Sequence, residues 1–485
     1  MAGNYQKSMY NQLMEVMARL DAVENSLRIE KKEHKEDVEG LNARIECLTE
    51  ENRLLRNDHA RLKSIINNNS SNTSLPPSAD QKSGKSVNAY NGREKTGKKS
   101  GGQKGRRGTT LTKSDVEEKI KLGQCKHEIK EIGNPHGNGY ITKYVVDLKV
   151  IPEITEIRIY AGEDGHFSIP KEYHSDVVYG ADIKAMAVAL YSEGVMSNDR
   201  IAAFLNAASK DEIGLSEGSV YGFCKSLSKK TAASIEHLEN ELLNQRVVST
   251  DATTVTVNGK QNYIRNFSVE KTVIYRAMKS KSINAMGNLR FLEKFTGTLV
   301  HDHETALYHF GTDHAECNVH IIRYLRKNTE DTKHTWSSQM ISLLCEMNKA
   351  RKDHIHQGAD SFPTDVVSTY EKRYMELIAL GRVENKTTVQ KYAKKDEITL
   401  LSRMEKYSRN HLLFLHDFAV PFDDSMSERD LRKAKNRQKM AGGFRKDSGH
   451  EMYCSLLTVV ETLKRRKMSL FENIRKFFNG TPAIF

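Results

Sequence analysis

The sequence predicts a multidomain α/β protein, in which an N-terminal α-helical coiled coil and a helical region precede a mixed sheet flanked by helices. Three observations lead to this prediction. Leucine recurs at every seventh position near the N-terminus, residues 178–243 have helical periodicity, and the run from 246 alternates apolar and polar residues as strands do. With 485 residues, of which 38% are hydrophobic, the chain can bury more than one core.

The charge balance favours an anionic partner. Lys and Arg number 75 against 63 Asp and Glu, which gives a net charge of +12 and suggests nucleic acid or an acidic membrane surface. No stretch approaches the ~18 apolar residues of a spanning helix, and the first residues lack a signal peptide's apolar core. The six cysteines stand singly, without a C-x-x-C pair. We therefore expect no membrane association and a reducing, cytoplasmic location.

Residues 1–66 are predicted to form a coiled coil. Asn52 occupies an a-type position, where a polar residue favours one register, and only His34 interrupts the leucine series. The leucines stand at 13, 20, 27, 41, 48, 55 and 62. The expected consequence is a homo-oligomer; the alternative is an amphipathic helix that packs on its own domain.

Residues 67–112 are predicted to form a flexible basic linker. The segment begins with "NNNSSNTSLPPSAD", which has too few apolar side chains to offset chain entropy. Its second half is basic and could bind DNA phosphates through counterion release. The candidate DNA-binding residues here are Lys98, Lys99, Lys104, Arg106 and Arg107. A solvated linker without DNA contacts is the alternative.

Residues 113–175 are predicted to form a small β-rich module, because "GYITKYVVDLKVIPEITEIRIYAG" alternates apolar and polar residues. The module resembles a degenerate zinc finger, since Cys125, His127, His136 and His166 could be ligands. The sequence "CKHE" has no second close-spaced pair, so we predict no metal there.

Residues 176–245 are predicted to be consecutive helices, with Ser197 and Ser216 as N-caps. Short helices with a tight turn are typical of a helix-turn-helix DNA-binding region. Ordinary helical packing gives the same pattern, and the sequence leaves both interpretations open.

Residues 246–325 are predicted to form three antiparallel strands, a helix and a further strand. Asn258-Gly259 between two β-rich runs indicates a hairpin. Asp251 lies in the first strand and Asp302 at the end of the fourth, 302 − 251 = 51 residues later. If these strands are neighbours, the two carboxylates converge into a site for hard divalent ions, which prefer oxygen ligands.

Residues 416–485 are predicted to be helices that supply a third acid. Asp424 or Ser425 could cap a helix that carries Glu428 in its first turns. Arg432, Lys435 and Lys439 follow and are candidate contacts for DNA phosphate. Glu461, in "LLTVVETLKRRKM", is the competing third acid, although it lies within an amphipathic helix.

Several stretches carry a resemblance to a known family. "VVSTDATTV", "LVHDHETALYHF", "HAECNVHIIRYL" and "DDSMSERDLRKAKNRQKMAGGFR" resemble bacterial transposases of insertion sequence family 66. The resemblance implies an RNase H-like catalytic domain with a DDE triad, which maps by motif onto Asp251, Asp302 and Glu428. It also implies a helical insertion at 326–415 and two Mg²⁺ ions, with Mn²⁺ as a substitute.

The resemblance assigns roles to further residues. The family's C-x-x-H-x-x-R pattern is present as Cys317, His320 and Arg323, which are expected to support the site. Metal ligation by His314, Cys317 and His320 is the alternative. Trp336, in the predicted insertion, could stack on an unpaired base or belong to a core.

The expected function is therefore a DNA transposase that cuts element ends and joins the 3′-hydroxyl to target DNA. Its expected partners are double-stranded DNA, both element ends and target, and accessory proteins of the same element, in the bacterial nucleoid. Two other classes stay open. One is a non-catalytic DNA-binding or assembly protein, derived from an inactivated transposase, and the other is an RNase H-like nuclease without strand transfer.

Overall fold

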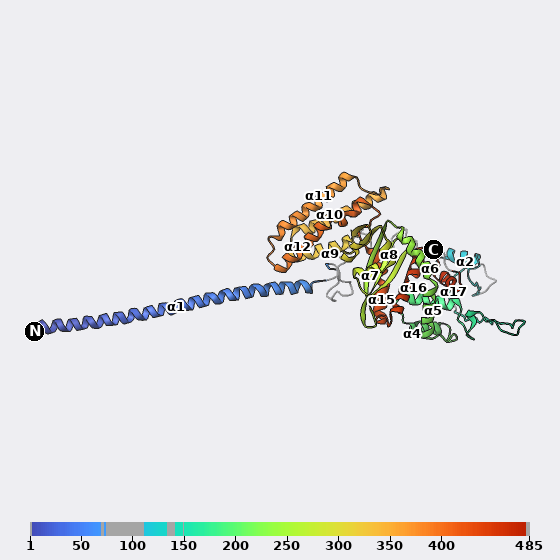
Figure 1. Ribbon diagram of the computed structural model, residues 1–485, viewed down its shortest axis with the longest axis horizontal. Coiled ribbons are helices and arrows are strands. Elements are labelled where there is room, and N and C mark those ends of the chain that lie inside the picture. The colour runs from blue at the N-terminus through green and yellow to red at the C-terminus, as the bar shows by residue number, and fades with distance from the viewer. Residues whose placement is uncertain (1, 69–71, 74–110, 133–140, 149, 482–485) are drawn as a thin grey trace. The chain divides into compact units, whose positions relative to one another are not determined.

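The computed structural model describes residues 2–68, 72–73, 111–132, 141–148 and 150–481. The chain divides into two compact units, each drawn as part of Figure 1 and described separately below. Unit 1 comprises Met1–Ala89 and His320–Arg409, and unit 2 comprises Tyr90–Val319 and Asn410–Phe485.

Unit 2 contains a five-stranded mixed sheet with the strand order β3-β2-β1-β4-β5. Strand β1 pairs antiparallel with β2, and β2 with β3, whereas β4 runs parallel to both β1 and β5. The strands are β1 (Val247–Val257), β2 (Lys260–Ser268), β3 (Val273–Met278), β4 (Thr298–His301) and β5 (Asp313–Glu316). The predicted order of three antiparallel strands followed by a further strand is confirmed.

The turn between β1 and β2 is the predicted hairpin. Asn258 and Gly259 have φ values of +48° and +73°, the left-handed pair that a two-residue turn between twisted strands requires. The single helix expected over 282–295 is instead two short ones, because Leu289 is extended between them. These are α7 (Ile283–Gly287) and α8 (Arg290–Lys294), and a 3₁₀ turn, η3 (Thr305–His309), follows β4.

Helices cover both faces of the sheet. On one face, Val255 of β1 and Tyr275 of β3 share a core with α3, α5 and α16. On the other face, Val248 and Phe267 pack with residues of α6 and α8. The alternation along each strand produces the two cores. The remaining helices of unit 2 are α2 (Lys113–Lys121), α3 (Ala181–Ser192), α4 (Asn198–Ala208), α5 (Glu217–Lys230), α6 (Ala232–Leu243), α13 (Ser408–His416), α14 (Ser425–Asp430), α15 (Arg432–Ala441), α16 (Asp447–Arg465) and α17 (Leu470–Phe478).

The region 176–245 is helical as predicted, with Ser197 and Ser216 capping α4 and α5. It is not a separate domain, because α3 and α5 share their core with the sheet. The turn before α4 depends on Gly194, whose φ is +71° and whose added Cβ would lie 2.7 Å from the Tyr453 hydroxyl. The turn is therefore fixed by its packing against α16.

The predicted β-rich module at 113–175 is wrong for the residues that the structure describes there. The stretches 113–132, 141–148 and 150–175 contain α2 and a short 3₁₀ turn, η2 (Lys171–Tyr173), and no strand. Apolar side chains of the alternating pattern, such as Val145 and Ile154, are more than 90% exposed. Alternation indicates a strand only where a partner strand and a core accept it, and neither is present for these residues.

Unit 1 contains α1 and the helical insertion. The insertion was expected at 326–415, whereas the compact unit spans His320–Arg409. Trp336 is fully buried and its Nε1 donates to Glu397 Oε1 at 2.7 Å, so the base-stacking interpretation is wrong and the residue belongs to the core. The helices are α1 (Ala2–Ile66), α9 (Asn318–Thr332), α10 (Thr335–His356), α11 (Thr364–Asn385) and α12 (Lys391–Lys406).

The end of α1 contacts this insertion within unit 1. Ser64 donates to Asp331 at 3.0 Å, and Asn72, which is buried, donates to Glu330 at 2.7 Å. Asn72 of the predicted linker is thus held in place, while most of 67–112 lies outside the described residues. Among the helices that the structure describes, none is long and apolar enough to cross a bilayer.

Candidate active site

Asp251 lies in β1 and Asp302 directly follows β4, the parallel strand next to it. Ser249 of β1 pairs with Val300 of β4, and two further residues along each strand lead to Asp251 and Asp302. Because β1 and β4 are neighbours in the sheet, the two carboxylates can converge as predicted. Burial and, next, the negative charge of Asp302 raise the pKa of Asp251.

One hydrogen-bond donor and two lysine side chains lower the pKa of Asp251 and so partly offset this increase. The Ala252 backbone N–H donates to Asp251 Oδ1 at 2.6 Å and lowers the pKa of Asp251. The charges of Lys281, after β3, and Lys435, on α15, lower it too. The carboxylate of Asp251 thus faces an acid from β4 and bases from two other elements.

Helix α14, which carries Glu428, is joined to the sheet through Asn266. This β2 residue pairs with Asp251 in the sheet and is fully buried. Its Oδ1 accepts from the Asp251 backbone N–H at 3.0 Å and from Ser427 Oγ at 3.3 Å. Its Nδ2 donates to the Ser427 carbonyl at 3.1 Å. One side chain therefore holds both Asp251 and the turn that presents Glu428.

The last turn of α14 is held by Asp430. Ser268 Oγ donates to Asp430 Oδ2 at 2.6 Å, and the Arg465 guanidinium pairs with Oδ1 from α16. The Tyr275 hydroxyl donates to the Asp430 carbonyl at 3.2 Å. A six-residue helix is too short to be stable alone, so these contacts determine where it lies.

Asp424 is a fourth carboxylate at this place, and the sequence interpretation assigned it only a capping role. Its side chain does not cap α14, and the residue is 1% exposed. Burial raises the pKa of Asp424 well above its ordinary value, and the charges of Asp251, Glu428 and Asp302 raise it further. In the sequence, Asp424 is visible only as part of the pair "DD", and this pair gives no indication that the second aspartate is buried.

Cys317 connects the two halves of the site. The Asp424 backbone N–H donates to Cys317 Sγ at 3.3 Å, and the Cys317 N–H donates to the carbonyl of His301, the residue before Asp302. Cys317 thus lies where a supporting residue was expected. His320 and Arg323, its partners in the predicted pattern, belong to unit 1, where His320 is buried.

Glu316, buried on β5, pairs with His301, the residue before Asp302, and sequence reasoning missed Glu316 and its partners. Glu316 Oε1 interacts with His303 Nδ1 at 2.6 Å and accepts from the Tyr308 hydroxyl at 2.5 Å. Glu316 Oε2 lies 3.2 Å from His411 Nε2. His303, directly after Asp302, has φ +62°, a strained conformation for a residue other than glycine. The cluster thus holds the turn that follows Asp302.

The opposite face of the sheet has a second contact near this turn. Arg265 is fully buried, and its guanidinium pairs with Glu304 at 2.6 Å and donates to Thr250 Oγ1 at 3.0 Å. Thr250 precedes Asp251, and Glu304 lies two residues after Asp302. Arg265 therefore links the segment that contains Asp251 to the segment that contains Asp302, on the face of the sheet opposite Asp251.

Glu461, the competing third acid, lies in a different environment from Glu428. Its carboxylate pairs with Lys433 at 2.7 Å and with Lys464 at 3.5 Å. Glu428 instead acts on the pKa of Asp424, next to Asp251. Glu428 therefore lies near enough to Asp424 to affect its pKa, whereas Glu461 is paired with two lysines.

The predicted DNA-binding residues of α15 share its exposed face. Arg432, Lys435 and Lys439 are all exposed, and Lys435 is near enough to lower the pKa of Asp251. Gln438, on the same helix, accepts from the Thr256 N–H at 2.7 Å and fixes α15 against β1. The linker candidates Lys98, Lys99, Lys104, Arg106 and Arg107 lie outside the described residues.

Among the residues that the structure describes, no group of three or more His, Cys, Asp or Glu side chains is arranged as a ready-made metal site. The chemistry of the donor set nevertheless fits a hard cation, because all four side chains are carboxylates and Asp424 Oδ1 is buried without a hydrogen-bond partner in the described structure.

The central part of the chain is similar to a known protein family. A family model described as "Transposase IS66 family" matches residues 176–452, more than half of the chain. The chain belongs to this transposase family. The matched range contains Asp251, Asp302, Asp424 and Glu428, so the whole cluster lies within the family's shared region. A search of curated proteins found no match. As an IS66-family transposase, the protein is a DNA-processing enzyme.

Proposed function

We propose that this IS66-family protein cuts the ends of its element and joins the freed 3′-hydroxyl to target DNA, with DDE chemistry at Asp251, Asp302 and Glu428. The observation that carries the proposal is the juxtaposition of Asp251 and Asp302 by the β1–β4 register, with Glu428 presented by a helix that Asn266 attaches to Asp251. A strand order of β3-β2-β1-β4-β5 also supports an RNase H-like interpretation of the sheet.

In this proposal Asp251, Asp302 and Glu428 hold two Mg²⁺ ions, for which Mn²⁺ can substitute. Such ions supply Lewis acidity, which activates water or a 3′-hydroxyl and stabilises the attacking and leaving oxygens of the phosphoryl group. Because the side chains are not arranged as a ready-made site, ion binding has to draw them together. Asn266 and Cys317 limit how far each acid can move.

The basic side chains around the acids would hold DNA. Lys281 and Lys435 both face Asp251, and Arg432 and Lys439 extend the positive face of α15. Phosphate groups bind such surfaces through charge and counterion release. The substrate strand would therefore cross α15 on its way to the acids.

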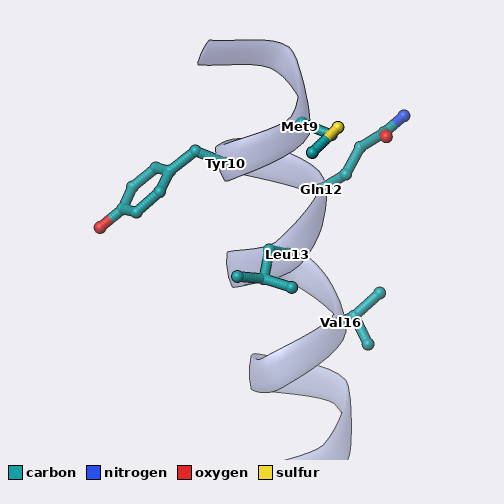
Figure 2. Close-up of a pocket in the computed structure, with 5 residues that line it drawn as sticks. All are labelled: Met9, Tyr10, Gln12, Leu13 and Val16. Carbon is teal, nitrogen blue, oxygen red and sulfur yellow. The ribbon is translucent and has the colours of Figure 1, made fainter. Parts of the chain in front are cut away.

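We further propose that α1 joins two or more copies as a coiled coil. Its seven heptad leucines are 47–61% exposed, which is unfavourable unless another helix covers them. Figure 2 shows the side chains of Met9, Tyr10, Gln12, Leu13 and Val16 projecting outward from the start of this helix. A paired rod would bring two catalytic domains, and thus two element ends, into one complex.

The test is metal-dependent cutting and joining on duplexes that carry the terminal sequences of the element. Asp251→Asn, Asp302→Asn and Glu428→Gln should each lower cutting by more than about 100-fold, the scale for loss of one charge-stabilising group. Glu461→Gln is the matched control, because its carboxylate is paired with Lys433. It should cut like the wild type.

Each alternative has its own outcome. Cutting without joined products would indicate a nuclease that lacks strand transfer. Equal cutting by the wild type and the Asp251→Asn variant, or none by either, would overturn the catalytic proposal and favour a DNA-binding or assembly role.

A further inference from the structure

Asp424 has an environment that a structural role does not explain. It is 1% exposed, and its Oδ1 has no hydrogen-bond partner among the described residues. Buried polar atoms are normally paired, because an unpaired one loses its hydration without compensation. Asp424 is at the N-cap position of α14, but its side chain makes no capping hydrogen bond to the backbone. The usual reason for an aspartate at this position is therefore missing.

The charges around Asp424 further disfavour its ionised carboxylate in the absence of a cation. The charges that raise the pKa of Asp424 most, after its burial, are those of three acids, Asp251 of β1, Glu428 of α14 and Asp302 after β4. A hydrogen bond with Ser427 lowers this pKa. An acid among three acids destabilises the folded chain unless a cation lies between them.

The backbone of Asp424 is nevertheless held firmly in this position. Its N–H donates to Cys317 Sγ at 3.3 Å, and its carbonyl accepts from the Glu428 N–H at 3.2 Å. Cys317 is in turn bound to the carbonyl of His301, next to Asp302. The contacts that fix Asp424 are therefore the same ones that fix Glu428 and the end of β4.

We propose that Asp424 is a fourth carboxylate ligand of the divalent ions in this site. The inference rests on the proposed metal-dependent function and adds to it a residue beyond the three of the DDE triad. Its unpartnered Oδ1 is the free ligand atom, and hard divalent ions prefer such oxygen donors. Four ionised carboxylates also balance the charge of two divalent cations, whereas three leave an excess of positive charge.

The experiment is a Mn²⁺ titration of the full chain, followed by electron paramagnetic resonance and without DNA. Asp424→Asn keeps the shape of the side chain and removes its charge. It should weaken Mn²⁺ binding about 10-fold or more, or reduce the number of bound ions. In a chelator, the same variant should melt at or above the wild-type temperature, because a buried repulsion has been removed.

Asp423→Asn is the matched control. Asp423 is the adjacent acid, but its Oδ1 already has a partner, because it accepts from the Ser425 N–H at 2.9 Å. It should bind Mn²⁺ like the wild type. Asp424→Ser, which also lacks the charge, provides a second variant if the asparagine fails to fold, and it should lose Mn²⁺ affinity in the same way.

Asp251→Asn serves to distinguish the two proposals. If Asp251→Asn loses Mn²⁺ affinity while folded Asp424→Asn and Asp424→Ser keep it, the fourth-ligand inference is wrong and the proposed function stands. If the wild type itself binds no Mn²⁺ and does not cut with any divalent ion, the proposed function fails and the inference fails with it.

Discussion

Asn266 holds Asp251 from the neighbouring strand: its Oδ1 accepts from the Asp251 backbone N–H at 3.0 Å, while its Nδ2 donates to the Ser427 carbonyl at 3.1 Å. A single amide can do both, because it has an acceptor at one end and donors at the other. The relative position of the β1 acid and the α14 acid therefore depends on one buried side chain.

We predict that Asn266→Asp disrupts this connection. The carboxylate cannot donate to the Ser427 carbonyl and adds a charge near Asp430, whose Oδ2 lies 3.3 Å from Nδ2 in the wild type. Loss of such buried hydrogen bonds should lower the free energy of unfolding by about 1–3 kcal/mol. The rate of cutting should fall further than this stability loss explains. Urea unfolding and end-cutting assays measure the two effects.

Asn262→Asp is the control for that change. Asn262 lies on the same face of β2 and is buried, but its Nδ2 donates only to the nearby Lys260 carbonyl, at 3.3 Å. Cutting by this variant should stay close to wild type. An equal loss of cutting in both variants would show that any added charge on β2 is harmful and that Asn266 has no special positioning role.

The sequence was sufficient where local chemistry determines the structure. Asn258-Gly259 predicted its hairpin because few other residues adopt two consecutive positive φ values. Strand periodicity placed Asp251 and Asp302 at two strands, and their convergence was predicted on the condition that these strands are neighbours, which the strand order confirms. The hairpin is determined within two adjacent strands, whereas the second prediction needed the sheet order as well.

The sequence was insufficient where the environment comes from distant residues. Asp424 is in contact with Cys317, 107 residues away, and the charges of Asp251 and Asp302 act on its pKa, whereas its own neighbours in the chain predicted a simple cap. The alternation at 141–160 predicted strands, yet it contains no information on whether a partner strand exists. Trp336 is a core residue because Glu397, on another helix, accepts its indole N–H.

Glu316→Gln should weaken the turn that carries Asp302. In the wild type, the Tyr308 hydroxyl donates to Oε1 at 2.5 Å, and His303 and His411 contact the same carboxylate. An amide replaces one acceptor oxygen with a donor, so at least one partner loses its hydrogen bond. We expect a loss of about 1–3 kcal/mol in the free energy of unfolding for each unpaired donor, measured by urea titration.

The functional effect of Glu316→Gln should exceed that of an ordinary destabilised variant. His303, with its φ of +62°, needs its contact with Glu316 to remain in this conformation directly after Asp302. Cutting should therefore fall even at temperatures where the variant is fully folded. Glu293→Gln, on the exposed side of α8, is the control and should change neither stability nor cutting. Normal cutting by folded Glu316→Gln would contradict the positioning role.

His450 should make the protein less stable in mild acid. The side chain is 2% exposed and stacks on Phe444 with ring centroids 5.2 Å apart. Burial lowers the pKa of His450 from 6.5 to about 4. The unfolded chain therefore binds a proton more readily than the folded one, and stability falls as the pH drops from about 6.5 toward 4. The loss attributable to this group should reach about 2–3 kcal/mol near pH 4.5.

The measurement compares unfolding free energies at pH 7 and pH 4.5. His450→Phe keeps an aromatic ring against Phe444 and removes the titrating group, so its pH dependence should be smaller than that of the wild type. It should not vanish, because burial also lowers the pKa of His301, to about 3. His34→Gln, on exposed α1, is the control. An identical pH dependence in His450→Phe and the wild type would show that His450 is not responsible.

Leu48→Asp should separate the copies that α1 is proposed to join. Leu48 belongs to the heptad series and is 48% exposed in the single chain. In a coiled coil it would be a buried knob, so a carboxylate there would lose its hydration and face its own symmetry mate. Light scattering coupled to size-exclusion chromatography should show a lower mass for the variant at equal concentration.

Ala43→Asp provides the comparison on the same helix. Ala43 lies two positions after Leu41 in the heptad, on the side away from the leucine seam, and is also exposed. An aspartate there has the same intrinsic helix propensity as one at Leu48, so any general weakening of the helix is matched. If the mass falls for Leu48→Asp but not for Ala43→Asp, the leucine face is the interface. If neither variant dissociates, the copies associate through a surface other than α1, and if the wild type is already monomeric the rod has another role.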